Sequence, residues 1–150
     1  MEFSTELNCR TEEFFQILTD YEKLPIYLPR QLQKIQVLEY NDDETLIECT
    51  IMFKTLIKKE ISQKIQINEK DKNLIIKVLD GHAKNTIINL SIISNDEKIE
   101  INVDVDLKLS LKAKILSPII KREYKSLLTG VFAKMALDAQ KMRGTENEHS

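Results

Sequence analysis

The clearest indication of the fold is the stretch IEINVDVDLKLSL, residues 99–111. Every odd-numbered position in it is Ile, Val or Leu, and every even-numbered position is polar or charged. This strict period of two predicts a strand with one dry face and one solvent-exposed face. We therefore expect an antiparallel sheet, together with a second element that covers its dry face.

A long amphipathic helix follows this stretch and is the expected cover. Apolar residues recur at steps of three and four from Ile120 to Met142, and basic residues mostly avoid that stripe. Ser117 and Pro118 fit the start of a helix. Alternatively, residues 112–116 are helical too, and Pro118 then kinks a longer helix.

The segments before residue 99 complete an α+β pattern. Alternation over Phe3–Leu7 predicts a first strand, Thr11–Thr19 has helical period, and a second short helix is expected to open at Pro25. From about Gln33 we expect some six antiparallel strands joined by short turns, with Asp80-Gly81 as a two-residue hairpin turn. The predicted fold is one curved antiparallel sheet of about seven strands wrapped around the long C-terminal helix, with two short helices after strand one.

Length and composition indicate one globular domain. The chain has 150 residues, 42% hydrophobic residues and a net charge of −2, so neither a disordered chain nor a general nucleic-acid binder is expected. We expect a single domain over residues 1–143 and a disordered tail at 144–150. The start resembles no signal peptide and no apolar run could span a membrane. The sequence thus predicts a soluble cytoplasmic protein whose Cys9 and Cys49 are free thiols.

Several common chemistries are disfavoured. Only two histidines occur, one of them in the predicted tail, and the three glycines are too far apart for a phosphate-binding loop. We therefore expect no metal and no cofactor. Cys49 is expected to be a small buried apolar group, because no nearby histidine could activate it. Glu100, Asp104 and Asp106 share the polar face of their strand, so we expect them to point outward.

Four segments carry a family resemblance. They are, in chain order, Asp20-Tyr21-x-x-Leu24-Pro25-x-x-Leu28-Pro29, Met52-Phe53-Lys54, Leu79-Asp80-Gly81-His82-Ala83-Lys84, and the passage through Leu116 and Pro118 into the long helix. Together they resemble the coenzyme Q-binding and oligoketide (polyketide) cyclase/dehydrase family of the START-like, or SRPBCC, superfamily, over roughly residues 1–142. The resemblance implies the helix-grip fold, also called the birch-pollen-allergen-like fold. Thr55 replaces a frequent family glycine, and the usual tryptophan is missing from residues 87–90, so the resemblance does not identify the ligand.

The resemblance implies three kinds of function. Members of the family carry or chaperone polyprenyl quinones and other lipids, cyclise or aromatise polyketides, or, in one bacterial branch, interfere with ribosomal subunit association. Our leading hypothesis is a non-enzymatic carrier or chaperone that holds a lipid, a polyprenyl quinone or a polyketide-like molecule between sheet and C-terminal helix. The alternatives are a cyclase or aromatase with Tyr124 as its catalytic acid–base group, and a module that docks to a ribosome or a membrane.

The inner faces of the strands and of the long helix supply the candidate ligand-binding residues. Most of these side chains would equally serve as ordinary core. Gln63 and Tyr124 could hydrogen-bond a ligand; otherwise Gln63 bonds nearby backbone and the Tyr124 hydroxyl reaches solvent. The candidates are Leu28, Ile51, Phe53, Gln63, Ile65, Leu90, Val103, Val105, Tyr124, Leu128, Val131 and Phe132.

Two further segments are candidates for contacts at the surface. The apolar, proline-rich residues 24–29 could form a lid, with Leu24, Pro25, Tyr27 and Pro29 as its members, or a plug packed on the sheet edge. Residues 107–125 hold six basic residues against Glu123 alone, a balance of +5. This segment is either a solvated face or a docking surface for anionic lipid headgroups or ribosomal RNA. The docking candidates are Lys112, Lys114, Lys121, Arg122 and Lys125.

Overall fold

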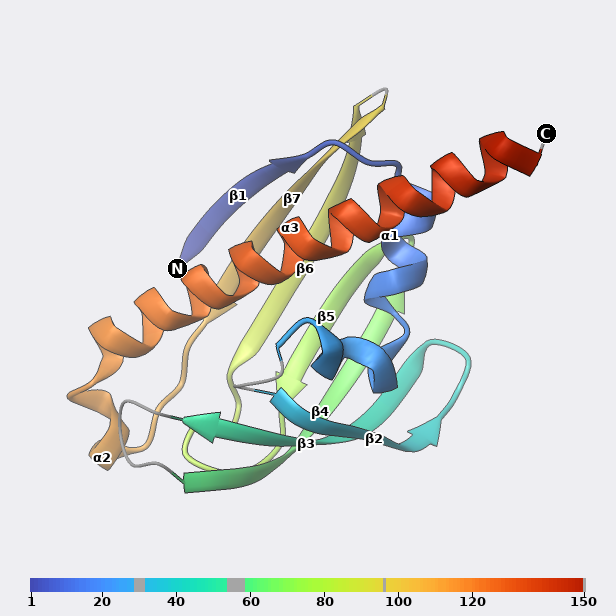
Figure 1. The fold of residues 1–150 in the computed structure, drawn as a ribbon. Coiled ribbons are helices and arrows are strands. Elements are labelled where there is room, and N and C mark those ends of the chain that lie inside the picture. Colours follow the sequence, from blue (N-terminus) through green and yellow to red (C-terminus); the bar gives the residue numbers. More distant parts are fainter. Residues whose placement is uncertain (29–31, 54–58, 96, 150) are drawn as a thin grey trace.

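The computed structural model describes residues 1–28, 32–53, 59–95 and 97–149, with the side chains at 53, 59–61, 112 and 143–149 left aside (Figure 1). Seven strands, two short helical elements after the first strand and a long final helix follow one another along the chain. Their bounds are β1 Glu2–Leu7, α1 Thr11–Leu18, the 3-10 helix η1 Tyr21–Ile26, β2 Leu32–Tyr40, β3 Glu44–Phe53, β4 Lys59–Lys70, β5 Asn73–Val78, β6 Ile87–Asn95, β7 Lys98–Asp106, α2 Leu111–Lys114 and α3 Ser117–His149.

The strands form one antiparallel sheet in the order β1-β7-β6-β5-β4-β3-β2. The sheet curves around α3, which crosses its inner face diagonally, and α1 and η1 lie beside the second half of that helix (Figure 1). Because each chain reversal is short, sequential strands pair with one another and only β1 joins from the far end of the order. The predicted helix-grip architecture is confirmed.

Strand β7 accounts for the alternation of apolar and polar residues that begins at Ile99. Ile99, Ile101, Val103 and Val105 are buried, whereas Glu100, Asp104 and Asp106 are exposed, as the alternation predicts. The strand pairs with β1 on one side and with β6 on the other, so its backbone is hydrogen-bonded along both edges. The expectation that the three carboxylates point outward is confirmed.

Strand β7 ends earlier than the alternation in residues 99–111 predicts. β7 ends at Asp106 instead of Leu111. The hydroxyl of buried Thr86 accepts a hydrogen bond from the Lys108 amide at 3.0 Å and donates one to the Lys108 carbonyl at 3.1 Å. A side chain thus takes over the backbone partners that a neighbouring strand would otherwise supply. Alternation continues to Leu111, but Leu111 itself opens α2 and is exposed.

Three further element boundaries bear on the sequence predictions. The Asp80-Gly81 turn belongs to an eight-residue connection between Val78 and Ile87, in which Gly81 adopts a φ of +81°. The second short helix begins at Tyr21 and contains Pro25 instead of opening there. The long helix begins at Ser117, as predicted, with α2 as a separate turn before it. Its helical backbone continues to His149, into the stretch expected to be a tail.

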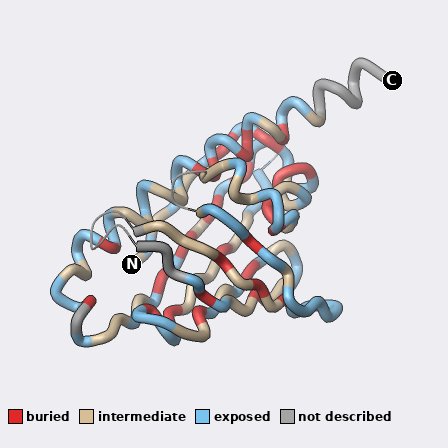
Figure 2. The backbone as a smooth tube through the Cα atoms, turned by 60° about the horizontal axis from the view of Figure 1, so that its bottom comes forward, coloured by how far each residue is buried: buried red, intermediate tan, exposed pale blue. Residues whose placement is uncertain are grey.

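The tightly packed core lies under the second half of α3. Phe14 of α1 and Phe132 of α3 are 0% and 1% exposed, and their rings meet edge to face at 6.1 Å between centroids. Figure 2 shows buried positions along the second half of α3 and mostly exposed or intermediate positions along its first half. Four further apolar residues are buried outside this contiguous core, namely Val78, Ala83, Ala113 and Ile120.

Candidate functional site

Several inward-facing apolar side chains of the sheet keep accessible surface. Ile51 on β3 and Ile65 on β4 are only partly buried, although in each case a residue two positions away on the same inner face is buried. Ile76 on β5 and Ile88 on β6 behave in the same way. An inward-facing apolar side chain retains accessible surface only where the layer above it leaves space unfilled. The inner face of the sheet is therefore less completely covered at these four positions than at the buried positions of β7.

Tyr124 is the polar group of α3 in this region. Burial raises the pKa of its phenol, yet part of the residue remains accessible. Within the described part of the chain its hydroxyl makes no hydrogen bond, so it is free to serve a partner from outside the chain. Leu128, one turn further along α3, is also partly buried.

Gln63 has a partner in the protein. Its side chain is buried, and its amide nitrogen donates to the backbone carbonyl of Asp80 at 3.4 Å. This is the backbone contact that we considered as the alternative to ligand binding. The bond is long, and Gly81 lies against the same amide group. Gln63 therefore steadies the connection after β5, and its role towards a ligand stays a prediction.

The remaining candidate lining residues lie in several surroundings. Leu28 is partly buried and packs on the main core, while the Phe53 side chain lies outside the described residues. The others are 1–6% exposed and belong to the contiguous core, where neighbouring side chains already fill the space around them. They are Leu90, Val103, Val105, Val131 and Phe132.

The predicted lid is fastened to α3. Leu24 and Tyr27 pack on the core, Pro25 is partly buried, and Pro29 lies outside the described residues. The Tyr27 hydroxyl donates to Asp138 Oδ2 at 2.6 Å, and Lys134 Nζ donates to the Tyr27 carbonyl at 3.2 Å. η1 also lies against β2 at the sheet edge. This is the placement expected of a plug, and a lid movement would have to break both hydrogen bonds.

We expect Tyr27→Phe to lower the free energy of unfolding by about 1 kcal/mol at neutral pH, because one partly exposed hydrogen bond to a carboxylate is lost. Burial and the bond to Asp138 raise the pKa of Tyr27 from 10 to about 12. A raised acid pKa stabilises the fold below pH 10, and that contribution disappears as the pH rises from 10 through about 12. Urea unfolding of both proteins from pH 8 to pH 11 measures it. Tyr40→Phe, at an exposed tyrosine, is the control, and a difference that persists undiminished at high pH would contradict the assignment.

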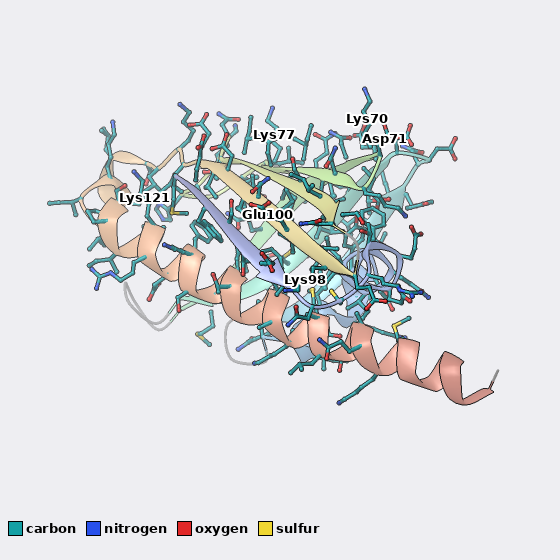
Figure 3. The ribbon with its side chains drawn as sticks, turned by 90° about the horizontal axis from the view of Figure 1, so that it is seen from above. Lys70, Asp71, Lys77, Lys98, Glu100 and Lys121 are labelled. Carbon is teal, nitrogen blue, oxygen red and sulfur yellow. The ribbon has the colours of Figure 1, made fainter. Side chains whose placement is uncertain are left out.

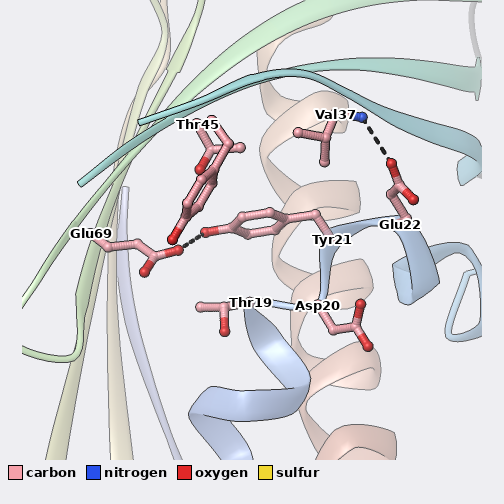
Figure 4. Close-up of a pocket in the computed structure, with 8 residues that line it drawn as sticks. Thr19, Asp20, Tyr21, Glu22, Val37, Thr45 and Glu69 are labelled. Atoms are coloured by element: carbon pink, nitrogen blue, oxygen red, sulfur yellow. Dashed lines mark hydrogen bonds between the residues drawn. The ribbon is translucent and has the colours of Figure 1, made fainter. Parts of the chain in front are cut away.

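A hollow that was not predicted lies near the end of α1 (Figure 4). Its volume is about 300 Å³ and its lining includes Asp20, Glu22 and Glu69. Tyr21 donates a hydrogen bond to Glu69, and burial together with that bond raises the pKa of Tyr21. Glu22 accepts from the Val37 amide at 3.3 Å. Both polar and apolar side chains line the hollow. The sequence signal for it was the acidic flank of the proline-rich segment, which we interpreted only through its apolar members.

The thiols do not form a reactive site. Burial, reinforced by a neighbouring glutamate, raises the pKa of Cys9 to about 11 and that of Cys49 to about 12. Both cysteines are free, as predicted, and both are buried, which was expected for Cys49 alone. Among the residues that the structure describes, no cluster of three His, Cys, Asp or Glu side chains is arranged to hold a metal ion. Likewise, no helix in the described chain combines the length and apolarity needed to cross a membrane.

The predicted docking residues cluster around the start of α3. Lys114, Lys121, Arg122 and Lys125 are exposed, while the Lys112 side chain lies outside the described residues. Figure 3 shows Lys121 near the first turn of α3, at the end of the helix remote from the C-terminus, and Lys77 and Lys70 on the outer face of the sheet. The basic segment thus lies around α2 and the first turns of α3.

Comparison with known proteins places the chain by its fold. The sequence matches no protein-family model and no curated protein. Among solved structures, it is similar to the Zhui aromatase/cyclase from Streptomyces sp. R1128, with a TM-score of 0.70, 9% identity and coverage of 90% of this chain and 92% of that one. A START superfamily protein from Mycobacterium smegmatis is similar with a TM-score of 0.68, 13% identity and coverage of 88% of this chain and 93% of that one. Norcoclaurine synthase from Thalictrum flavum is similar with a TM-score of 0.70, 13% identity and coverage of 91% of this chain and 92% of that one.

These likenesses define a class of fold. The seven-stranded antiparallel sheet, the short helices after β1 and the long C-terminal helix constitute the helix-grip fold of START-like and Bet v1-like proteins. These similar structures include both enzymes and a protein without a stated reaction. Fold similarity at this level of identity therefore leaves the function to be argued from the site.

Proposed function

We propose that the chain binds a hydrophobic small molecule between the sheet and the first half of α3, as a carrier or chaperone. The single observation that supports this most is the accessible surface on inward-facing Ile51, Ile65, Ile76 and Ile88. In the proposed site these side chains would form the sheet side, and Tyr124 and Leu128 would form the helix side. An apolar region with one well-placed polar group is typical of a small-molecule site.

The proposed site would recognise its ligand mainly by burial. Each square ångström of apolar surface removed from water contributes about 25 cal/mol, so an elongated lipid or quinone gains most of its affinity from its apolar body. Tyr124 would donate one hydrogen bond to a carbonyl or hydroxyl oxygen of the ligand and fix its orientation. Because burial raises the pKa of Tyr124, the phenol is protonated at neutral pH and available as a donor.

The same property weighs against the enzyme alternative. A cyclase or aromatase needs a group that accepts a proton, and a phenol with a raised pKa is a poor base at neutral pH. Cys49 faces the core and is also protonated, since its pKa is about 12. Tyr124 could act as an acid, but no partner base stands beside it in the described residues. We therefore favour binding without reaction.

The phenol test separates the two functions. We expect Tyr124→Phe to bind the neutral fluorescent probe 1-aminoanthracene with a Kd within about tenfold of the natural chain, because one hydrogen bond contributes about 1 kcal/mol. Displacement of the probe by decylubiquinone measures the preference for a carbonyl-bearing ligand, and this preference should fall in the variant. Tyr40→Phe is the matched control. Absence of saturable probe binding to the natural chain would contradict the proposal, and turnover lost in Tyr124→Phe would favour the enzyme.

A further inference from the structure

The corner between α2 and α3 presents apolar side chains directly to solvent. Leu111 is 89% exposed and Ile115 is 85% exposed, which are the highest values for large apolar residues in the described chain. Ile119, a further four residues on, is 39% exposed. Ala113 and Ile120 on the other side of the same segment are buried. The corner therefore carries apolar side chains towards solvent as well as towards the protein interior, unlike an ordinary amphipathic surface helix.

The segment leading into this corner is held in place by hydrogen bonds. The Ser110 amide donates to the His82 carbonyl at 2.8 Å, and the Ser110 hydroxyl lies 2.9 Å from His82 Nδ1. The amides of Ala113 and Lys114 both donate to the Ser110 carbonyl. Leu111 and Ile115 thus belong to a hydrogen-bonded turn. Their exposure reflects the architecture of the corner, because the segment's inward positions are already occupied.

Positive charge surrounds the exposed apolar groups. Residues 107–122 contain five basic residues and no acidic residue. Lys108 is paired with Asp106 at 3.6 Å. Lys114, Lys121 and Arg122 are exposed, and within the described part of the chain none of the three forms an ion pair. Figure 3 places Lys121 at the beginning of α3.

We propose that this corner docks onto an anionic lipid bilayer. Leu111 and Ile115 would enter the boundary between headgroups and acyl chains, and Lys114, Lys121 and Arg122 would contact lipid phosphates. The combination of an apolar tip with a basic rim is what an interfacial anchor requires. An RNA partner fits less well, since aliphatic side chains offer no stacking surface for bases.

The docking surface is independent of the proposed ligand site but lies near it. Tyr124 follows Ile120 by one helical turn, and Ile120 is buried beneath the corner. A molecule docked in this way would present the first half of α3 to the membrane. Vesicle binding requires no bound ligand, so the two proposals fail or succeed separately.

Vesicle flotation tests the docking surface with phosphatidylcholine vesicles that contain about one-third phosphatidylserine, or none. We expect binding to the anionic vesicles that weakens as salt is raised. Leu111→Gln/Ile115→Gln should weaken it at least tenfold, and Lys121→Glu/Arg122→Glu likewise, since each basic residue contributes about fivefold. Leu137→Gln, at an exposed apolar position near the other end of α3, and Lys77→Glu, on the outer face of the sheet, should bind normally.

A second measurement locates the contact even if a variant folds poorly. The chain contains no tryptophan, so Ile115→Trp adds a single fluorescent reporter at the corner. Its emission should shift to the blue on anionic vesicles and be quenched by brominated lipid, whereas Leu137→Trp should show neither effect. The proposal is overturned if the natural chain does not bind anionic vesicles, if the corner variants bind normally, if the Ile115→Trp reporter stays in water, or if the corner binds RNA instead of vesicles.

Discussion

Phe132→Ala is expected to lower the free energy of unfolding by about 3–5 kcal/mol. The ring is 1% exposed, so its removal leaves a cavity that the surrounding side chains can fill only in part. The edge-to-face contact with Phe14 is lost as well, and such a contact contributes about 1 kcal/mol beyond burial. Since α1 and α3 meet at this pair, the loss loosens the attachment of the long helix to the rest of the fold.

Urea and thermal unfolding measure this prediction. For a chain of this length the melting temperature should fall by roughly 10 °C. Leu137→Ala on the same helix is the control, because Leu137 is exposed and its truncation should change stability by less than about 0.5 kcal/mol. Equal effects of the two substitutions would mean that Phe132 does not carry the packing we assign to it.

Leu128→Trp should abolish ligand binding while leaving the fold intact. Leu128 is partly buried on the face of α3 that contains Tyr124. If the space beneath it is unfilled, the larger ring enters that space and blocks it, with little effect on stability. We expect the affinity for 1-aminoanthracene to fall at least thirtyfold, which corresponds to about 2 kcal/mol.

A filled core would respond in the opposite way. There, overpacking would cost about 1–3 kcal/mol of stability, and no ligand affinity would exist to be lost. Leu137→Trp, at an exposed position of α3, controls for the effect of a tryptophan on the helix. Calorimetric titration together with urea unfolding thus distinguishes an unfilled site from a filled one on the same variant.

The fold was largely predictable because its pattern is local and periodic. Alternation over Ile99–Val105 and the helical stripe from Ile120 each depend on a single periodicity, and together they require a sheet with a helix on one face. The errors occurred where side chains replace backbone partners. Thr86 ends β7 through its hydroxyl, and nothing in the local spacing around Leu107 signals that a residue twenty positions earlier will do so.

The candidate site was predictable only as a set of inward positions. Alternation places Ile65 and Val103 on the same inner face, yet only Ile65 keeps accessible surface. That difference depends on how far α3 stands from each strand, which is a property of the whole fold. The hydrogen bond between Tyr27 and Asp138 joins residues 111 positions apart and has no local signature either. The exposed corner at Leu111 was hidden by its continuity with the strand pattern.

Native mass spectrometry of the freshly purified chain, followed by organic extraction of anything bound, is the most direct test of hydrophobic-ligand binding between the sheet and α3. We expect a discrete added mass that extracts as an apolar molecule, and we expect this mass to be lost in Leu128→Trp. A protein that shows only its own mass, and that also fails to take up 1-aminoanthracene or decylubiquinone, would contradict the claim that the space beneath α3 holds a hydrophobic ligand.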